Sequence, residues 1–383
     1  MNDLSPSLVD SSRAPSVLDP LLSPFRCKSL SVANRFVMAP MSRYFAPNGM
    51  IIPEVADYYR RRIDGGCGAV ITEGISIDRP GAVAADRVPQ FHGAKSLAAW
   101  KNVVDQCHAA GGAFIPQLWH VGGCIDFNYP DSPHPPLESP SGLVGPETEG
   151  GRPMSASDIA DVIASFTRAA VDAQSIGCDA IELHGAHGYL FDQFFWEVTN
   201  RRDDRYGGTS LRDRSRFAAE VVASIRSAVG PDFALIFRVS QWKVYDYDCK
   251  LARNPDEMAD WLGPIADAGV DIFHCSDRRF WEPAFEGDDR NLAGWAKEVT
   301  GKPTITVGSV GLNRDLMQDF VDGESSPEPE RLDELARRFD RGDFDLVAIG
   351  RVVLSDHDWL QKVLHGRFGE LRPYSMATKV DLY

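Results

Sequence analysis

The chain has 383 residues, of which 43% are hydrophobic and 25% charged, a globular composition that argues against wholesale disorder and against a membrane protein. The formal net charge of −15 argues against a nucleic-acid partner, because no overall positive field attracts a phosphate backbone. Seven cysteines are scattered singly with no CxxC pair, so neither a zinc knuckle nor a thiolate-bound cluster is indicated, and a reducing compartment is expected.

The first twenty residues are rich in Ser, Pro and Asp and lack the apolar stretch of a secretory signal. We therefore expect a flexible N-terminal arm over residues 1–20 of a cytoplasmic protein. From residue 21 to residue 383, short β-branched or apolar runs alternate with longer amphipathic segments. The predicted strands are 35–39, 69–72, 113–117, 180–184, 234–239, 271–275, 304–307 and 346–349.

Helical patterns fall between these strands, and examples are 157–173, 211–229 and 255–268. The last one follows Asn254, a good capping residue, and begins with Pro255 at the first helical position. This regular alternation predicts a single-domain α/β protein, a closed (β/α)8 TIM barrel over residues 21–383 with insertions at its rim. Longer irregular stretches over 122–154 and 189–210 follow the third and fourth strands, where catalytic loops of a barrel lie.

Polar side chains occur where several predicted strands end. They are Ser42, Thr72, Gln117, His184 and Arg238. Each of them alone is explained by a structural cap or a rim hydrogen bond. Because the carboxyl ends of barrel strands meet at one mouth, their convergence favours a functional site instead.

Ordered motifs on successive predicted strands make the chain resemble the old yellow enzymes, a family of FMN-dependent ene-reductases. The resemblance extends from about residue 21 to about residue 359. The motifs are NRFVMAPMSR from Asn34, AVITEG from Ala69, PQLWHVG from Pro116, IELHGAHGYLFDQF from Ile181, TNRRDDRYGG from Thr199, FRVS from Phe237, TVGSVG from Thr306 and DLVAIGR from Asp345. Such an ordered series is far more specific than one glycine-rich match.

The resemblance implies a non-covalently bound FMN whose ring has the Ser42 hydroxyl at its C4 carbonyl. Gly74 would let the backbone approach the ring, and Gln117 would pair with its pyrimidine edge. Arg238 would place a cation where negative charge collects on reduction. The residues implied beside the ring are Ala39, Pro40, Met41, Ser42, Gly74, Gln117 and Arg238.

The FMN phosphate needs backbone amides and a fork of donors at the end of the barrel. Gly308 and Ser309 follow the seventh predicted strand, and Gly350 and Arg351 follow the eighth. Turn geometry alone would explain the glycines but not the arginine beside Gly350. We therefore expect these four residues to bind the phosphate.

His184 and His187 allow three interpretations: a metal pair, a buried structural pair, or two donors to a substrate carbonyl oxygen. A metal would want a third ligand, and His120 is the only histidine in another similar strand-end motif. The resemblance implies the third interpretation, because relatives hold an enone oxygen between two such side chains. Two N–H groups would stabilise that oxygen more as it becomes enolate-like.

Tyr189 matches the position of the family's proton donor, and a phenol can act there as a general acid. A buried aromatic with a satisfied hydroxyl is the competing interpretation. Aromatic residues are the candidate walls of a substrate pocket, although aromatics more often belong to a core. They are Trp119, ranked first, Tyr44, Trp242, Phe280 and Trp281.

The resemblance therefore implies an enzyme that reduces the C=C bond of α,β-unsaturated carbonyl or nitro compounds with NADPH or NADH, by ping-pong hydride transfer through flavin N5. Alternatives are a non-catalytic flavin-binding barrel, a flavin-dependent desaturase running in the opposite direction, and a flavin-free barrel acting on a phosphorylated metabolite. A homo-oligomer is compatible with the sequence, while a metal or a membrane partner is not indicated. Segments 241–251 and 277–289 have no assignment from the family pattern.

Overall fold

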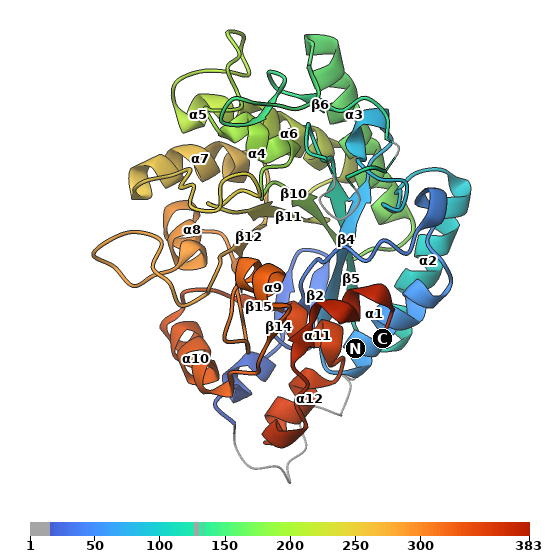
Figure 1. The fold of residues 1–383 in the computed structure, drawn as a ribbon, viewed down its shortest axis with the longest axis vertical. Coiled ribbons are helices and arrows are strands. Elements are labelled where there is room, and N and C mark those ends of the chain that lie inside the picture. The colour runs from blue at the N-terminus through green and yellow to red at the C-terminus, as the bar shows by residue number, and fades with distance from the viewer. Residues whose placement is uncertain (1–15, 126–129, 133) are drawn as a thin grey trace.

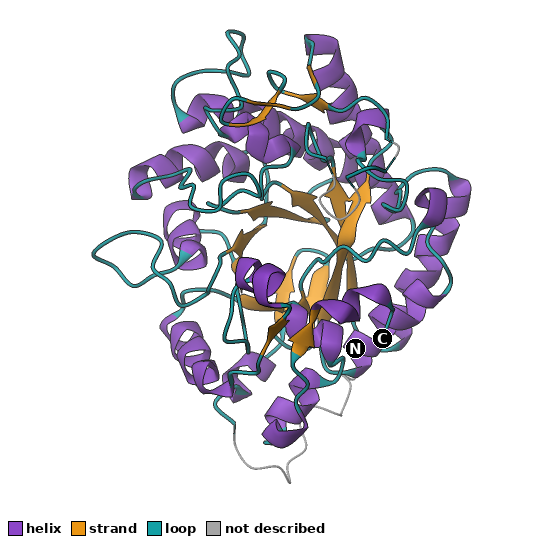
Figure 2. Ribbon diagram, viewed as in Figure 1, coloured by secondary structure: helices purple, strands orange, loops and turns teal. Residues whose placement is uncertain are grey.

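The computed structural model describes residues 16–125, 130–132 and 134–383. Its centre is a closed barrel of parallel strands, enclosed by helices (Figures 1 and 2). The barrel strands are β3 (Phe36–Met38), β4 (Ala69–Ser76), β5 (Ala113–Trp119), β10 (Ala180–His184), β11 (Ala234–Val239), β12 (Ile272–Ser276), β13 (Thr304–Val307) and β15 (Leu346–Ile349). They follow one another in chain order around the barrel, and β15 closes it against β3. The predicted (β/α)8 barrel is confirmed.

The predicted strand bounds agree with the observed ones to within one residue at each end, except that β4 and β5 end later than predicted, at Ser76 and Trp119. The sequence predicts that the β4 strand ends at Thr72, but β4 continues to Ser76 through a register shift between Ile71 and Gly74. The shift leaves Thr72 fully buried, where its Oγ1 donates to the Glu73 carbonyl oxygen and accepts from the Gln117 N–H at 3.0 Å.

Helices cover the outside of the barrel. They are α1 (Glu54–Asp64), α2 (Ala94–Ala109), α3 (Ala156–Ser175), α4 (Leu190–Phe195), α5 (Leu211–Arg214), α6 (Arg216–Val229), α7 (Pro255–Asp267), α8 (Leu292–Thr300), α9 (Leu316–Asp322), α10 (Leu332–Arg341), α11 (Arg351–Ser355) and α12 (Trp359–Leu364). The Asn254 side chain caps α7 by accepting from the Glu257 N–H at 2.9 Å, as predicted. The predicted helix 211–229 is divided into α5 and α6 at Ser215. The Ser215 hydroxyl donates to the Trp261 carbonyl oxygen in α7.

Two hydrophobic layers hold the barrel together. Small and β-branched side chains such as Ala69, Ala180 and Ile236 fill its interior, and larger aromatic and aliphatic side chains pack between the strands and the helices. The antiparallel pair β1 (Phe25–Cys27) and β2 (Leu30–Val32) contributes Leu30 and Val32 to the interior layer. The rim loops begin at the carboxyl ends of the strands.

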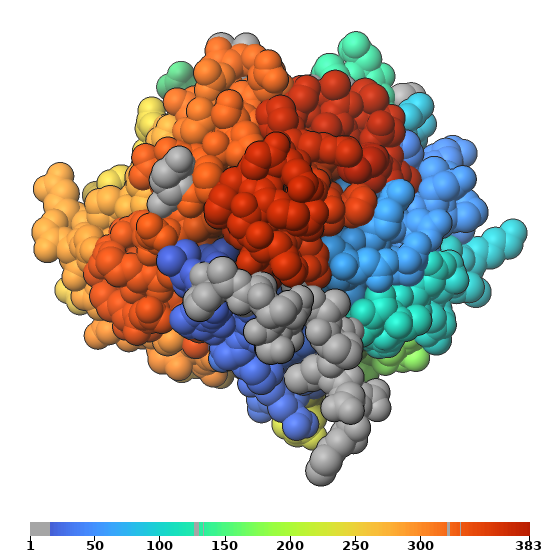
Figure 3. Space-filling model, turned by 90° about the horizontal axis from the view of Figure 1, so that it is seen from below, coloured from blue at the N-terminus to red at the C-terminus, as the bar shows by residue number. Residues whose placement is uncertain are grey.

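Rim insertions occupy the carboxyl ends of the strands. The segment after β5 carries the short strands β6 (Glu138–Ser139), β7 (Leu143–Gly145), β8 (Thr148–Glu149) and β9 (Arg152–Pro153). The last strand, β16 (Tyr374–Ser375), pairs with β14 (Glu324–Ser325). The C-terminal segment lies against the first third of the chain, where Arg43 donates to the Thr378 carbonyl oxygen at 3.1 Å (Figure 3).

Most of the predicted N-terminal arm, residues 1–15, lies outside the described residues. Within its remainder, Leu18 is buried in the outer hydrophobic layer. No described helix has both the length and the apolar character required to cross a bilayer.

Candidate functional site

A cavity of about 920 Å³ opens at the carboxyl end of the barrel. Its wall contains every residue that the sequence predicted for the cofactor: Ala39, Pro40, Met41, Ser42, Gly74, Gln117, Arg238, Gly308, Ser309, Gly350 and Arg351. The predicted substrate-side residues His184, His187, Tyr189, Trp119, Tyr44 and Trp242 line the same cavity. The fold thus brings together groups that are more than 300 residues apart in sequence.

Three predicted positions lie elsewhere, and these predictions were wrong. Thr72 is buried beneath the mouth at the register shift in β4. Phe280 is fully buried and packs edge-on against Trp281, with ring centroids 5.1 Å apart. Trp281 lies under the Arg331 guanidinium, 4.0 Å from the ring centroid. Neither aromatic residue is part of the described cavity wall.

The proposed substrate side is built around the turn that follows β10. His184 ends this strand, and its ring lies 5.2 Å from the His187 ring and 5.0 Å from the Tyr189 ring, measured between centroids. The Trp119 ring packs edge-on at 4.9 Å from Tyr189. His187 has a left-handed backbone with φ of 67°, a conformation uncommon for residues other than glycine and concentrated at functional sites.

Both histidines are held in the neutral state. Burial lowers the pKa of His184 and the pKa of His187 well below the ordinary imidazole value, and the Arg238 guanidinium lowers both further. Each ring therefore carries one N–H at neutral pH. The His184 ring lines the cavity, and its Nδ1 atom is buried without a hydrogen-bond partner among the described residues.

Hydrogen bonds connect His187, through Ser276, to Arg238. His187 Nε2 lies 2.9 Å from Ser276 Oγ, which also accepts from Arg238 Nη2 at 3.4 Å. Because arginine can only donate, the serine hydroxyl proton remains available to His187 Nε2. This arrangement favours the His187 tautomer that carries its proton on Nδ1.

The predicted phosphate residues follow the neighbouring strands β13 and β15 in the cavity wall. Arg351 forms an ion pair with the buried Asp319 carboxylate, and its Nη2 donates to Ser309 Oγ at 3.0 Å. Ser309 has a left-handed backbone with φ of 52°, which turns the chain at this point. Asp319 was not predicted, because a carboxylate in a surface-type helical sequence carries no signal for an anion site.

The sequence also missed wall residues from distant segments. They are Arg43, Phe45, Arg87, Val244, Tyr247, Ser276, Asp277, Arg278, Val307, Val310, Leu312, Leu316, Met317, Ala348, Leu354, Tyr374, Lys379 and Val380. Arg43 and Ser276 stand within or beside the strand-end motifs, so their place in chain order could have indicated them. Lys379 and Val380 belong to the C-terminal segment, where no motif indicated a cavity wall.

The unassigned segment 241–251 is anchored to the substrate side by a fully buried ion pair, Lys243 Nζ to Asp192 Oδ1 at 2.7 Å. Asp192 belongs to α4 and also accepts from the Gly188 N–H at 2.7 Å. The anchor positions the neighbouring Trp242, whose ring stacks on His187 at 4.1 Å with a 20° interplanar angle. The segment therefore forms one side of the cavity.

Lys243→Met should destabilise the protein by about 3–5 kcal/mol, because it leaves the Asp192 carboxylate buried without its cation. Burial already raises the pKa of Asp192, and Lys243 opposes that rise. Urea unfolding measures the effect. The double variant Asp192→Asn/Lys243→Met should recover much of the loss, and equal losses in both variants would contradict the role of the pair.

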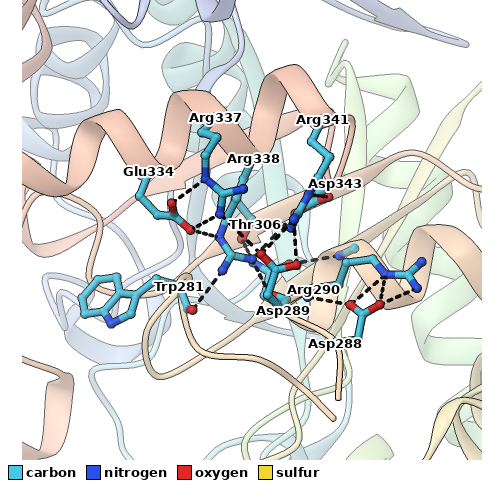
Figure 4. Close-up of polar contacts among 12 residues, drawn as sticks. Trp281, Asp288, Asp289, Arg290, Thr306, Glu334, Arg337, Arg338, Arg341 and Asp343 are labelled. Atoms are coloured by element: carbon cyan, nitrogen blue, oxygen red, sulfur yellow. Dashed lines mark hydrogen bonds and ion pairs between the residues drawn. The ribbon is translucent and has the colours of Figure 1, made fainter. Parts of the chain in front are cut away.

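The other unassigned segment, 277–289, begins in the cavity wall with Asp277 and Arg278. Farther along, it is clamped to α10 (Figure 4): the Asp289 carboxylate pairs with Arg341 at 2.6 Å, and Arg338 donates to the Asp289 carbonyl oxygen at 2.7 Å. Arg338 also donates to the Trp281 carbonyl oxygen at 3.0 Å. These contacts attach the segment to α10.

The residues present fit a flavin mononucleotide. Polar atoms without described partners, Arg238 Nε and Trp119 Nε1, belong to side chains of the cavity wall. A Cβ added at Gly74 would lie 2.6 Å from Trp119, so the backbone there admits no larger residue. No cluster of three or more potential metal ligands occurs among the described residues.

Comparisons with known proteins agree with this geometry. Residues 20–325 match the model of the NADH:flavin oxidoreductase / NADH oxidase family. The chain is 38% identical to 12-oxophytodienoate reductase 7 of Oryza sativa subsp. japonica, over 90% of this chain and 87% of that protein. It is 31% identical to an NADH oxidase of Thermoanaerobacter brockii over 92% of this chain, but it spans only 52% of that relative.

The fold is also that of a solved structure, morphinone reductase in complex with tetrahydroNAD. The two chains superpose with a TM-score of 0.73 at 24% identity, over 94% of this chain and 93% of the other. At 24% identity this likeness shows the fold alone, whereas the family model and the sequence relatives show that the chain belongs to the family. The chain therefore belongs to the NADH:flavin oxidoreductase / NADH oxidase family of FMN-dependent oxidoreductases, the old yellow enzymes.

Proposed function

We propose that the protein reduces the C=C bond of α,β-unsaturated carbonyl or nitro compounds with NADH or NADPH in a ping-pong reaction. The observation that carries this proposal is the convergence of His184, His187 and Tyr189 in one cavity with Gln117 and Arg238. The name of the rice relative, a 12-oxophytodienoate reductase, supports a reductase. Bound FMN would accept hydride from the nicotinamide and deliver it from N5 to the alkene.

Gln117, Arg238 and the segment 39–42 would hold the flavin ring, and Arg351 with the amides around Gly308 and Gly350 would hold its phosphate. A guanidinium is suited to the ring position because it stays charged even where burial lowers its pKa. The phosphate would compete with Asp319 for Arg351. The wall residues thus divide into a ring end and a phosphate end.

His184 and His187 would bind the oxygen of the electron-withdrawing group. Both are neutral, so each offers one N–H without bringing a positive charge into the cavity. Donors fixed in place stabilise an oxygen more as it gains negative charge in the transition state. Ser276 would orient His187 by satisfying its Nε2.

Tyr189 would deliver the proton to the α-carbon. Its phenol shares the cavity with both histidines, and α4 begins directly after it. A positioned general acid contributes roughly 10²–10⁴-fold to a rate. Trp119, Tyr44 and Trp242 would form the apolar walls around the alkene.

Arg351→Ala should weaken FMN binding by roughly 10- to 100-fold, which is the contribution of hydrogen bonds to a charged group. Riboflavin lacks the phosphate, so its affinity should stay unchanged. Fluorescence titration of the flavin-free protein with both ligands measures this. The control is Arg351→Ala/Asp319→Asn, which leaves no unpaired carboxylate, and an unchanged preference for FMN in both variants would argue against phosphate contact.

The proposed function is tested by screening the purified holoenzyme with cyclic enones, maleimides and nitroalkenes, using NADH and NADPH in turn. We expect a yellow protein that consumes nicotinamide in step with the loss of at least one of these alkenes. A yellow protein that oxidises neither nicotinamide with any alkene would overturn the proposal in favour of a flavin-binding barrel.

A further inference from the structure

A fully buried carboxylate lies behind the cavity wall, two residues before His184. The Glu182 Oε1 atom accepts from Gln117 Nε2 at 2.7 Å, and its Oε2 atom lies 2.6 Å from His274 Nδ1. Within the described residues, the cavity wall contains Gln117 but neither Glu182 nor His274. Burying a charge costs free energy even when the charge is hydrogen-bonded, so we expect a carboxylate next to the cavity to have a role beyond packing.

Strand register, together with the hydrogen bond between Glu182 and His274, places these groups in one belt across four neighbouring strands. Glu182 on β10 pairs with Gln117 on β5, His184 pairs with Arg238 on β11, and Arg238 pairs with His274 on β12. Ile236, the register partner of Glu182 on β11, belongs to the apolar interior of the barrel. The belt therefore joins the carboxylate to every side chain proposed for the pyrimidine end of the ring.

Glu182 decides which end of the Gln117 amide is offered to the cavity. An ionised carboxylate can only accept hydrogen bonds, so the amide nitrogen must face Glu182. The amide oxygen is then the group left for a ligand. The pyrimidine edge of a flavin carries one N–H donor, N3–H, and an amide oxygen is its complement.

Glu182 also sets the charge at this end of the cavity. It opposes the lowering of the Arg238 pKa that burial causes. His274 does not cancel the negative charge, because burial lowers its pKa and leaves the ring neutral. Arg238 is thus a cation whose charge interacts with that of Glu182.

We propose that Glu182 is a positioning residue that lowers the reduction potential of the bound flavin, by fixing the Gln117 amide and by offsetting the positive charge of Arg238. Two-electron reduction with uptake of one proton leaves one negative charge, which collects on the pyrimidine side of the ring. Arg238 stabilises that charge and Glu182 opposes it. This inference rests on the proposed flavin orientation.

The test measures the midpoint potential of the Glu182→Gln holoenzyme by spectroelectrochemistry. A glutamine keeps both hydrogen bonds once His274 changes tautomer, and it removes the negative charge. We expect a more positive potential, with reduction by nicotinamide faster and reoxidation by alkene slower, each by roughly tenfold. If the variant binds FMN and has the wild-type midpoint potential, the inference is overturned.

The matched control is Glu138→Gln. Glu138 is likewise buried, lies 3.1 Å from a buried histidine, His120, and is absent from the described cavity wall. Its replacement should leave the potential unchanged, and an equal shift in both variants overturns the inference.

If the Glu182→Gln variant does not bind FMN, a second variant, His274→Phe, is measured in its place. It removes a donor to the carboxylate but keeps the charge, so the potential should fall, and an unchanged or higher value overturns the inference. Failure of the proposed function is distinguishable, because a wild-type enzyme inactive on every alkene can still show these shifts in potential.

Discussion

Tyr189→Phe should slow alkene reduction by roughly 10²–10⁴-fold while leaving the reduction of the flavin by nicotinamide largely intact. The variant removes only the phenolic oxygen, so the ring keeps its edge-on contacts with Trp119 and His184 at 4.9 and 5.0 Å. Only the half-reaction that requires a proton at the α-carbon should respond. Stopped-flow spectroscopy measures the two half-reactions separately.

Tyr247→Phe is the matched control for this variant. Tyr247 also lines the cavity, and burial raises the pKa of its phenol to about 12, but its ring packs against Trp242 at 5.2 Å rather than against His184. We expect both half-reactions of the control to stay near the wild-type rates. A Tyr189→Phe enzyme that loses both half-reactions equally would contradict a proton-donor role.

His184→Ala should lower the rate of alkene reduction by roughly 10²–10³-fold, the cost of removing one donor to a developing oxyanion. The His184 ring lines the cavity beside His187 and Tyr189, which places it within reach of that oxygen. Phenols that form charge-transfer bands with the flavin should also bind more weakly, because their oxygen would occupy the same place.

Titration with a para-substituted phenol measures ligand affinity, and turnover with a cyclic enone measures the rate. His184→Asn serves as the control, because it keeps an N–H donor and should retain more of both than His184→Ala. If phenol affinity were the same in the wild type and in His184→Ala, His184 would not be a ligand of that oxygen.

The barrel could be predicted because its short apolar strands alternate with longer amphipathic helices, and such a pattern is visible in a single sequence. The site could be predicted where chemistry is tied to a strand end, as for Gln117, His184 and Arg238. Thr72 was misplaced because a register shift within a strand leaves no mark in the hydrophobic pattern. Its side chain is therefore part of the core.

Phe280 and Trp281 were misplaced for a different reason: an aromatic residue in an irregular segment looks the same whether it lines a cavity or attaches a loop. The contribution of Lys379 could not be predicted either, because it depends on where a C-terminal segment returns to the barrel. The ion pair of Lys243 and Asp192 joins residues 51 positions apart, and neither residue type indicates the other.

The left-handed backbone of His187 links the proposed function of this residue to the stability of the protein. A left-handed conformation at a non-glycine residue costs about 1–3 kcal/mol, and glycine would adopt it freely. Glycine would also forfeit the imidazole and its stacking partner Trp242. Selection for thermal tolerance alone would therefore favour glycine at this position, and a variant stabilised in that way should be a poorer catalyst.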